Sequence, residues 1–391
     1  MPLADGYPLP DRQIRLLHLI TGLDIGGAER QLPHILRRLD AARYQLIVCS
    51  LTTDGPIGAE LRQQGVEVVA LGARKCTDLG VLVRLARLLR RRRVDILHAH
   101  LFHSNVVARL IGRVCRVPVI VTSEHETGVW KRLPQLLIER ATARLGDRVI
   151  AVSQAAGDWA VRKQGVPRDR LCVIRAGVSV PAQTTDRESL RHRLREEFGF
   201  PQDAPVVLSV GRIHPAKGYE YLLAAVPIVR ASVPEARFLI VGGARDKDGA
   251  YLKALISSAE RLELGPAVTF AGAREDIADL MRGADMLALS SIWEGLPNVL
   301  LEAMAVGLPV VSTVAGGCAE LSDGGKNMRL VPIKDVRALA AAIIELLGDP
   351  ALRTSLAAAA QEFAERQLSW DTTAAALDSL YTSMLAARGR L

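Results

Sequence analysis

Short apolar runs alternate with longer stretches that have the apolar periodicity of amphipathic helices, and this alternation occupies nearly the whole chain. The runs are almost entirely apolar, as in strands that are buried on both faces of a parallel sheet. Strands alternating with helices predict such a sheet, covered by helices on both sides. In the first half, strands are predicted at 14–20, 45–51, 66–71, 96–99, 117–122 and 148–152, and helices at 28–38, 58–64, 79–91 and 104–115.

A polar segment with a proline, residues 178–186 (VSVPAQTTD), interrupts this pattern, and we interpret it as a linker between domains. The alternation then starts again. The second half is predicted to contain strands at 205–210, 237–241, 267–270, 286–289 and 309–313, and helices at 219–229, 250–261, 277–282, 298–305 and 336–347.

The chain is therefore predicted to be an α/β protein of two Rossmann-like domains, residues 12–180 and 187–370, which face each other across a cleft. A last helix over 371–388 is expected to pack back on the first domain. Ligands of open parallel sheets bind at the carboxyl ends of the strands. Polar residues that directly follow strands are therefore the candidates for function.

The composition is that of a globular protein of two or three domains, with 391 residues, 49% hydrophobic and 24% charged. No apolar run reaches the roughly 18 residues of a membrane span, and we expect no signal peptide because the N-terminus lacks a basic and apolar leader. Scattered cysteines without Cys-x-x-Cys spacing argue against disulfides or zinc and favour a reducing, cytoplasmic location. These cysteines are Cys49, Cys76, Cys115, Cys172 and Cys318.

The net charge of +8 is unevenly distributed. Residues 1–185 carry 28 Lys and Arg against 16 Asp and Glu, a balance of +12, whereas residues 186–391 carry 22 against 26, a balance of −4. The densest basic cluster is Arg84, Arg87 and Arg90–Arg93, which fits nucleic acid, an anionic membrane surface or simply a solvated helix face. No aromatic platform accompanies it, so nucleic-acid binding is not expected. We predict reversible electrostatic contact with the cytoplasmic face of a membrane.

Residues 290–311 (SSIWEGLPNVLLEAMAVGLPVV) are the most informative segment that follows a predicted strand. Gly295 permits a tight turn, and Pro297 suits the start of a helix whose free N–H groups attract anions. The carboxylates of Glu294 and Glu302 can accept hydrogen bonds from sugar and ribose hydroxyls. The alternative is that both are surface residues, although the apolar neighbours of Glu302 argue against full exposure.

Two weaker segments also follow predicted strands. In residues 209–222 (SVGRIHPAKGYEYL), Arg212 and Lys217 suit a diphosphate leaving group, in the role that magnesium plays elsewhere. In residues 21–30, Gly26 and Gly27 let the backbone approach a phosphate, but the spacing is not that of the dinucleotide fingerprint. The plainer alternatives are a pair of solvated cations and an ordinary helix-entry turn.

Histidines lie at two further strand ends. His98 and His100 share one face of a strand and His103 is near, so a metal site is conceivable. No cysteine or carboxylate cluster beyond Asp95 completes it, and we predict no metal. His125 follows another strand and either binds a sugar hydroxyl or is a structural histidine.

Together, these segments resemble the GT-B glycosyltransferases of glycosyltransferase family 4, over roughly residues 14–385. WEGLPNVLLEAMAVGLPVV resembles the family's paired-glutamate signature, VGRIHPAKG its Arg/Lys phosphate loop and GGAERQL its glycine loop. VDILHAHLFHSN and VIVTSEHE resemble its histidine-bearing strand ends. The glutamate segment is specific, whereas the other motifs are weak individually.

The resemblance implies metal-independent, retaining transfer of a hexosyl group from a nucleotide diphosphate-sugar, with a UDP-sugar expected, to a glycan, lipid-linked or small-molecule acceptor. Cell-envelope glycan biosynthesis is the expected setting. The second domain would bind the donor, and the first domain the acceptor, through loops such as residues 127–134.

The resemblance also implies roles for individual residues. Glu302 would bind the ribose, Glu294 would contact the transferred sugar, and His125 would lie near that sugar. Arg212 and Lys217 would bind the diphosphate. The remaining residues expected to bind the donor are Gly26, Gly27 (at the distal phosphate), Arg274, Gly295, Leu296, Pro297, Asn298 and Val299.

Two departures from the family pattern stand out. Glu126 occupies a position where many relatives have glycine, which predicts a different acceptor side. Met328 and Arg329 replace a glycine and an apolar residue, which predicts a strained or reshaped turn. A nucleotide-sugar epimerase on the same fold, or a non-catalytic sugar-binding subunit, stays open as an alternative function.

Overall fold

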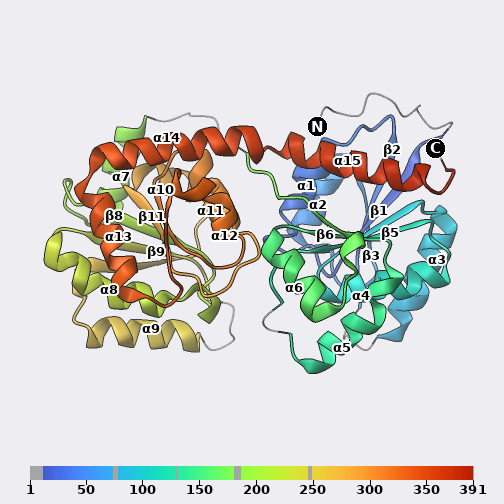
Figure 1. The fold of residues 1–391 in the computed structure, drawn as a ribbon, viewed down its shortest axis with the longest axis horizontal. Helices are drawn as coiled ribbons and strands as arrows, with labels where there is room; N and C mark the ends of the chain where they lie inside the picture. The colour runs from blue at the N-terminus through green and yellow to red at the C-terminus, as the bar shows by residue number, and fades with distance from the viewer. Residues whose placement is uncertain (1–11, 74–77, 129–130, 180–185, 245–248, 391) are drawn as a thin grey trace. The chain divides into compact units, whose positions relative to one another are not determined.

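The computed structural model describes residues 12–73, 78–128, 131–179, 186–244 and 249–390. Contacts divide the chain into two compact units (Figure 1). Unit 1 comprises Met1–Gly177 and Trp370–Leu391, and unit 2 comprises Val178–Ser369. Most of the predicted linker, Cys76, and part of the loop at 127–134 lie outside the described residues. No helix within the described residues is both long and apolar enough to cross a membrane.

Unit 1 is built on a parallel sheet. Its strands are β1 Ile14–Ile20, β2 Tyr44–Ser50, β3 Glu67–Ala70, β4 Ile96–His100, β5 Val119–Glu124, β6 Arg148–Ala151 and β7 Leu171–Val173. They lie in the order β3-β2-β1-β4-β5-β6-β7. The α-helices of this unit are α1 Gln31–Leu36, α2 Gly55–Gln63, α3 Leu79–Arg92, α4 Phe102–Val114, α5 Leu133–Thr142, α6 Gln154–Gln164 and α15 Trp370–Ala386.

Unit 2 repeats the plan. Its parallel strands are β8 Val206–Val210, β9 Arg237–Val241, β10 Val268–Gly272, β11 Met286–Leu289, β12 Val310–Thr313 and β13 Arg329–Val331, in the order β10-β9-β8-β11-β12-β13. Its α-helices are α7 Arg187–Phe198, α8 Tyr219–Ser232, α9 Ala250–Arg261, α10 Ile277–Gly283, α11 Asn298–Ala305, α12 Cys318–Leu321, α13 Val336–Gly348 and α14 Pro350–Gln367.

Both sheets have the strand order of a Rossmann fold, which confirms the predicted fold class. In each sheet the direction of progression reverses once, between β1 and β4 in unit 1 and between β8 and β11 in unit 2. The connections that follow the two strands at a reversal therefore run toward opposite edges of the sheet. Ligands of such sheets bind there, at the carboxyl ends of the strands.

Burial explains why these segments are strands. Every residue of β11 is buried, as is every residue of β4, including His98 and His100. Helix α3 buries Val81, Leu85 and Leu89 on one side and carries its arginines on the other. The apolar pattern that predicts the elements is therefore the pattern of the two cores.

The last helix, α15, packs on unit 1, as predicted, and lies beside α1 (Figure 1). The rings of His34 and Trp370 stack with centroids 5.0 Å apart. Tyr381 is completely buried, and its hydroxyl lies 2.6 Å from His98 Nδ1. Residues more than 280 positions apart in the sequence thus share one core.

A carboxylate of α15 holds two residues at the start of β2. The Tyr44 hydroxyl donates to Asp378 Oδ1 at 2.5 Å, and Arg43 Nη1 donates to Asp378 Oδ2 at 3.1 Å. A second aspartate, Asp371, accepts from Arg38 at 2.6 Å, but its side chain is 81% exposed against 34% for Asp378. The two ion pairs differ mainly in exposure.

We expect Asp378→Ala to lower the free energy of unfolding by about 1–3 kcal/mol, because it strips two partly buried donors of their acceptor. The matched variant Asp371→Ala removes an exposed pair and should cost less than about 1 kcal/mol. Denaturant unfolding of both variants measures the difference. Equal losses would mean that α15 is not anchored through Asp378.

Candidate functional site

Lys217 and Glu294 meet at the carboxyl edge of the sheet in unit 2. Lys217 follows β8 and Glu294 follows β11, the two neighbouring strands at which the strand order reverses. Lys217 Nζ donates to Glu294 Oε1 at 2.5 Å, and the side chains are 15% and 11% exposed. The sequence places both residues after strands, and the structure brings them into direct contact.

Further hydrogen bonds hold the Glu294 loop in place. The Ser291 hydroxyl donates to Glu294 Oε1 at 2.7 Å, and the Thr313 hydroxyl donates to the Ser291 carbonyl at 2.6 Å. The Ser290 hydroxyl donates to the carbonyl of Lys217 at 2.9 Å. Strand ends β8, β11 and β12 therefore position a single carboxylate and a single ammonium group.

Two glycines allow the loops to approach so closely. Gly316 has φ +54°, and a Cβ at this position would lie 2.0 Å from the carbonyl oxygen of Glu294. Gly218 has φ +60°, and its Cβ would lie 2.3 Å from the carbonyl oxygen of Ser290. Any larger residue must displace backbone, so the position of Glu294 depends on Gly316. Neither glycine is among the site residues predicted from the sequence.

Helix α11 begins immediately after this loop, at the predicted residue, Asn298. Pro297 is its N-cap, and Gly295, Leu296, Pro297 and Val299 are buried. Glu302 lies in the second turn and is half-buried between buried neighbours. The helix N-terminus, a favourable place for an anion, thus lies at the same sheet edge as Lys217.

The two arginines predicted at the site differ. Arg212 lies two residues after the end of β8 and is exposed. Arg274 follows β10, and carboxylates surround its guanidinium: Asp276 accepts at 2.8 and 2.7 Å and Glu197 at 2.5 Å. These carboxylates raise the pKa of Arg274, with the hydrogen bonds of Asp276 as the largest cause. Its guanidinium is therefore committed to neighbouring side chains.

In unit 1, Gly26 and Gly27 lie between β1 and α1, also at a carboxyl edge. The predicted helix at 28–38 is shorter in the structure and begins at Gln31, because Ala28–Arg30 form turns and Arg30 provides no capping side chain. The prediction of backbone strain at Met328 and Arg329 is wrong. Neither has a positive φ, Met328 is completely buried and Arg329 begins β13.

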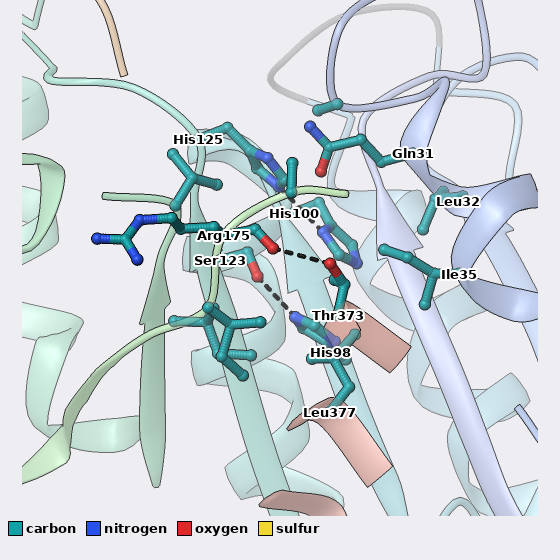
Figure 2. Close-up of a pocket in the computed structure, with 15 residues that line it drawn as sticks. Gln31, Leu32, Ile35, His98, His100, Ser123, His125, Arg175, Thr373 and Leu377 are labelled. Atoms are coloured by element: carbon teal, nitrogen blue, oxygen red, sulfur yellow. Dashed lines mark hydrogen bonds between the residues drawn. The ribbon is translucent and has the colours of Figure 1, made fainter. Parts of the chain in front are cut away.

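Histidines from β4 and from the position after β5 line a cavity of about 30 Å³ in unit 1 (Figure 2). His98, His100 and His125 line it together with Gln31 and Arg175. Figure 2 shows the ring of His125 next to that of His100, and their Nε2 and Nδ1 atoms are 3.1 Å apart. The sequence predicted His98, His100 and His125 at strand ends but not that a fourth histidine, His18, would join them.

Spacing alone would allow a metal ion among His18, His98 and His100, because one nitrogen of each lies within 4.8 Å of the others. However, the ring nitrogens of His98 contact Tyr381 and Ser123, and those of His100 contact His18 and His125. Hydrogen bonding thus accounts for both rings. Burial lowers the pKa of His18 to about 3 and that of His125 to about 4, so the imidazoles are neutral near pH 7.

Near His125 in the sequence, Glu124, Lys131 and Glu139 form a buried network of ion pairs that was not predicted. Lys131 Nζ donates to Glu124 Oε2 at 3.3 Å and to Glu139 Oε1 at 3.2 Å, and Gln164 donates to Glu124 at 3.1 Å. Burial opposes the charge of Glu124, but Lys131 and Arg109 hold its pKa below the usual value. Burial and then Glu124 raise the pKa of Glu139 to about 7. Lys131 and Gln164 therefore hold Glu124, which directly precedes His125.

Two family models match the chain: "Glycosyltransferase Family 4" over residues 25–180 and "Glycosyl transferases group 1" over residues 191–363. A D-inositol 3-phosphate glycosyltransferase of Corynebacterium urealyticum is 34% identical over 309 residues, 74% of this chain and 72% of that protein.

The chain belongs to the family 4 glycosyltransferases.

Other relatives agree with this assignment. The D-inositol 3-phosphate glycosyltransferase of Thermobispora bispora is 29% identical over 397 residues, covering 93% of this glycosyltransferase and 91% of that one. Among solved structures, Anabaena Alr3699/HepE in complex with UDP and glucose has a TM-score of 0.85 at 25% identity, covering 95% of this chain and all of that one. WaaG, at 19% identity and TM-score 0.70, shares the fold. The fold is GT-B.

We expect Gly316→Ala to lower the activity of this glycosyltransferase by roughly tenfold to a hundredfold, because the new methyl group displaces Glu294. The matched variant is Gly324→Ala, which has a similar φ of +69° but no heavy atom within 4 Å of the added Cβ. It should cost about 1–2 kcal/mol of stability from backbone strain and leave activity intact. Initial rates and unfolding curves separate the effects, and equal activity losses would contradict the role of Gly316.

Proposed function

We propose that the protein transfers a hexosyl group from a UDP-sugar to a hydroxyl of its acceptor, with retention of configuration and without a metal. The contact between Lys217 and Glu294 carries the proposal, because it places a cation and a carboxylate at the sheet edge where such folds bind ligands. HepE, the relative described above, was solved with UDP, and also with UDP-glucose.

In the proposed reaction, Lys217 and Arg212 bind the diphosphate and stabilise the negative charge that develops on it. Glu294 accepts hydrogen bonds from hydroxyls of the transferred sugar, and Glu302 accepts them from the ribose. The N-terminus of α11, from Pro297 to Val299, supports the anion. The bond between the anomeric carbon and the diphosphate oxygen breaks. The acceptor oxygen then bonds to the same face of that carbon, and its proton passes to the departing phosphate.

Unit 2 is therefore proposed to bind the donor and unit 1 the acceptor. Gly26 and Gly27 would contribute backbone N–H groups, and His125 would lie near the transferred sugar. Glycans, lipid-linked sugars and small hydroxyl compounds are the possible acceptors. Since the curated relatives above are named D-inositol 3-phosphate glycosyltransferases, a phosphorylated cyclitol is the first to try.

Proton NMR of the reaction in excess EDTA tests the proposal. We expect the rate to be unchanged by EDTA, because Lys217 and Arg212 supply the positive charge, and the first-formed product to keep the anomeric configuration of the donor. Lys217→Ala should lower kcat by at least about 100-fold. The control is Lys253→Ala, which changes an exposed lysine of α9 and should leave kcat unchanged.

An inverted product would exclude the retaining mechanism. Loss of activity in EDTA that Mg²⁺ or Mn²⁺ restores would exclude the metal-independent one. Full activity of Lys217→Ala would remove Lys217 from the donor site.

We also propose that unit 1 contacts the anionic cytoplasmic face of a membrane. The support is the surface of α3 and the residue that follows it, where Arg84, Arg87, Arg90, Arg91 and Arg93 are all exposed. Leu85 and Leu89 are buried on the opposite side, so the contact would be electrostatic. Each such residue contributes about 1 kcal/mol near an anionic surface, which suffices for reversible binding. The free thiols Cys49, Cys115, Cys172 and Cys318 fit a reducing compartment.

Co-sedimentation with phosphatidylserine vesicles measures this contact. We expect binding at low salt that is lost near ~1 M salt, where the screening length shrinks to about 3 Å. Changing Arg90, Arg91 and Arg93 to Gln should abolish binding. Changing three exposed basic residues of unit 2, Lys253, Arg261 and Arg337, to Gln alters the net charge equally and should not. No sedimentation at low salt, or equal losses in both variants, would contradict the proposal.

A further inference from the structure

Three histidines of unit 1 form a continuous hydrogen-bonded chain. His18 in β1 places its Nδ1 2.9 Å from Nε2 of His100 in β4. The other nitrogen of His100, Nδ1, lies 3.1 Å from Nε2 of His125, which directly follows β5. The rings of His18 and His100 are nearly parallel, with an interplanar angle of 13°. His100 thus links a buried residue to one that lines the cavity of Figure 2.

If all three imidazoles are neutral, their ring protons can be arranged in only two ways that form both hydrogen bonds. Burial lowers the pKa of all three histidines, so each ring carries a single N–H near pH 7. Each of the two hydrogen bonds needs one bare nitrogen and one N–H. The protons must therefore all lie on the Nδ1 atoms, directed from His18 toward His125, or all on the Nε2 atoms, directed the opposite way.

The two ends of the chain decide between these arrangements. His18 Nε2 and His125 Nδ1 are both buried and have no hydrogen-bond partner among the described residues. If the protons were on the Nε2 atoms, a donor would be buried without an acceptor at His18, which is completely buried. Buried N–H groups without partners are rarer and costlier than under-satisfied acceptors. With the protons on the Nδ1 atoms, the series of hydrogen bonds ends in an N–H of His125, a residue that lines the cavity, where a water or a ligand can accept it.

We propose that His100 is a positioning residue that holds His125 in the Nδ1–H tautomer, so that His125 acts as a hydrogen-bond donor to substrate. The group that His125 recognises is an oxygen that accepts this hydrogen bond, either of a sugar hydroxyl or of a phosphate. A bare Nδ1 would be needed to take a proton from the acceptor hydroxyl, so His125 is not the base of the reaction. The link to substrate rests on the proposed function, whereas the tautomer does not.

His98 provides a matched control within the same cluster. It is as buried as His100, and their ring centroids are 4.3 Å apart. Its nitrogens, however, contact the Tyr381 hydroxyl at 2.6 Å and the Ser123 hydroxyl at 2.7 Å, outside the chain. His98→Phe and His100→Phe therefore make the same chemical change at adjacent buried positions, but only the second interrupts the chain.

The test is ¹⁵N NMR of the protein labelled on its histidine rings, since protonated and bare ring nitrogens have distinct chemical shifts. In the wild-type protein we expect His18, His100 and His125 each to carry the proton on Nδ1. His100→Phe should give His125 a mixture of tautomers, and His98→Phe should leave the wild-type pattern. An Nε2–H tautomer of His125 in the wild-type protein, or an unchanged His125 in His100→Phe, would overturn the proposal.

Kinetics then test the link to substrate. We expect His100→Phe to lower kcat/KM by roughly threefold to tenfold, the range of one weakened hydrogen bond. His125→Phe should lower it by at least as much. Full activity of His125→Phe would contradict the placement of His125 in the proposed function, while the spectrum of the wild-type protein would still decide the tautomer.

Discussion

The reversal of strand order between β8 and β11 is the constraint on which the candidate site depends. It brings two loops from distant parts of the chain to one sheet edge and leaves room between their connections. At this edge, Lys217 and Glu294 form an ion pair of low exposure. The Ser291 hydroxyl donates to Glu294, and the Thr313 hydroxyl donates to the Ser291 carbonyl. The close backbone contact at Gly218 fixes the distance between these two loops, and the contact at Gly316 holds the Glu294 loop against the loop after β12. A few hydrogen bonds therefore define the site because the sheet has already brought the loops together.

The buried polar side chains of unit 1 are stabilised in two ways. Burial keeps His18, His100 and His125 neutral, and hydrogen bonds link the three rings in series. Glu124 and Lys131 keep their charges by pairing at short distance, whereas burial and the charge of Glu124 raise the pKa of Glu139 to about 7. Both groups lie around the strand ends beside His125. They lie next to the residue that we propose to contact the transferred sugar.

Much of the fold could be predicted from the sequence, because the strands of buried parallel sheets are continuous apolar runs. The bounds of β1, β9, β11, α9 and α11 agree with the structure. Short, half-buried strands were missed, such as β7, as was α5, whose apolar side is largely exposed. For Lys217 and Glu294, the sequence predicted only that both follow strands of one sheet, and it did not predict that their side chains are in contact. The network of Glu124 and Lys131 depends on tertiary neighbours and leaves no periodic signal in the sequence.

We propose above all that this edge of unit 2 binds a nucleoside diphosphate, with Glu302 on the ribose. Calorimetric titration of UDP into the wild-type protein and into Glu302→Ala tests it most directly. A carboxylate that accepts a hydroxyl hydrogen bond contributes about 1.5–3 kcal/mol, so the variant should bind UDP roughly tenfold more weakly, or worse, with its fold intact. Equal affinity of the two proteins would contradict the claim and would place the donor elsewhere.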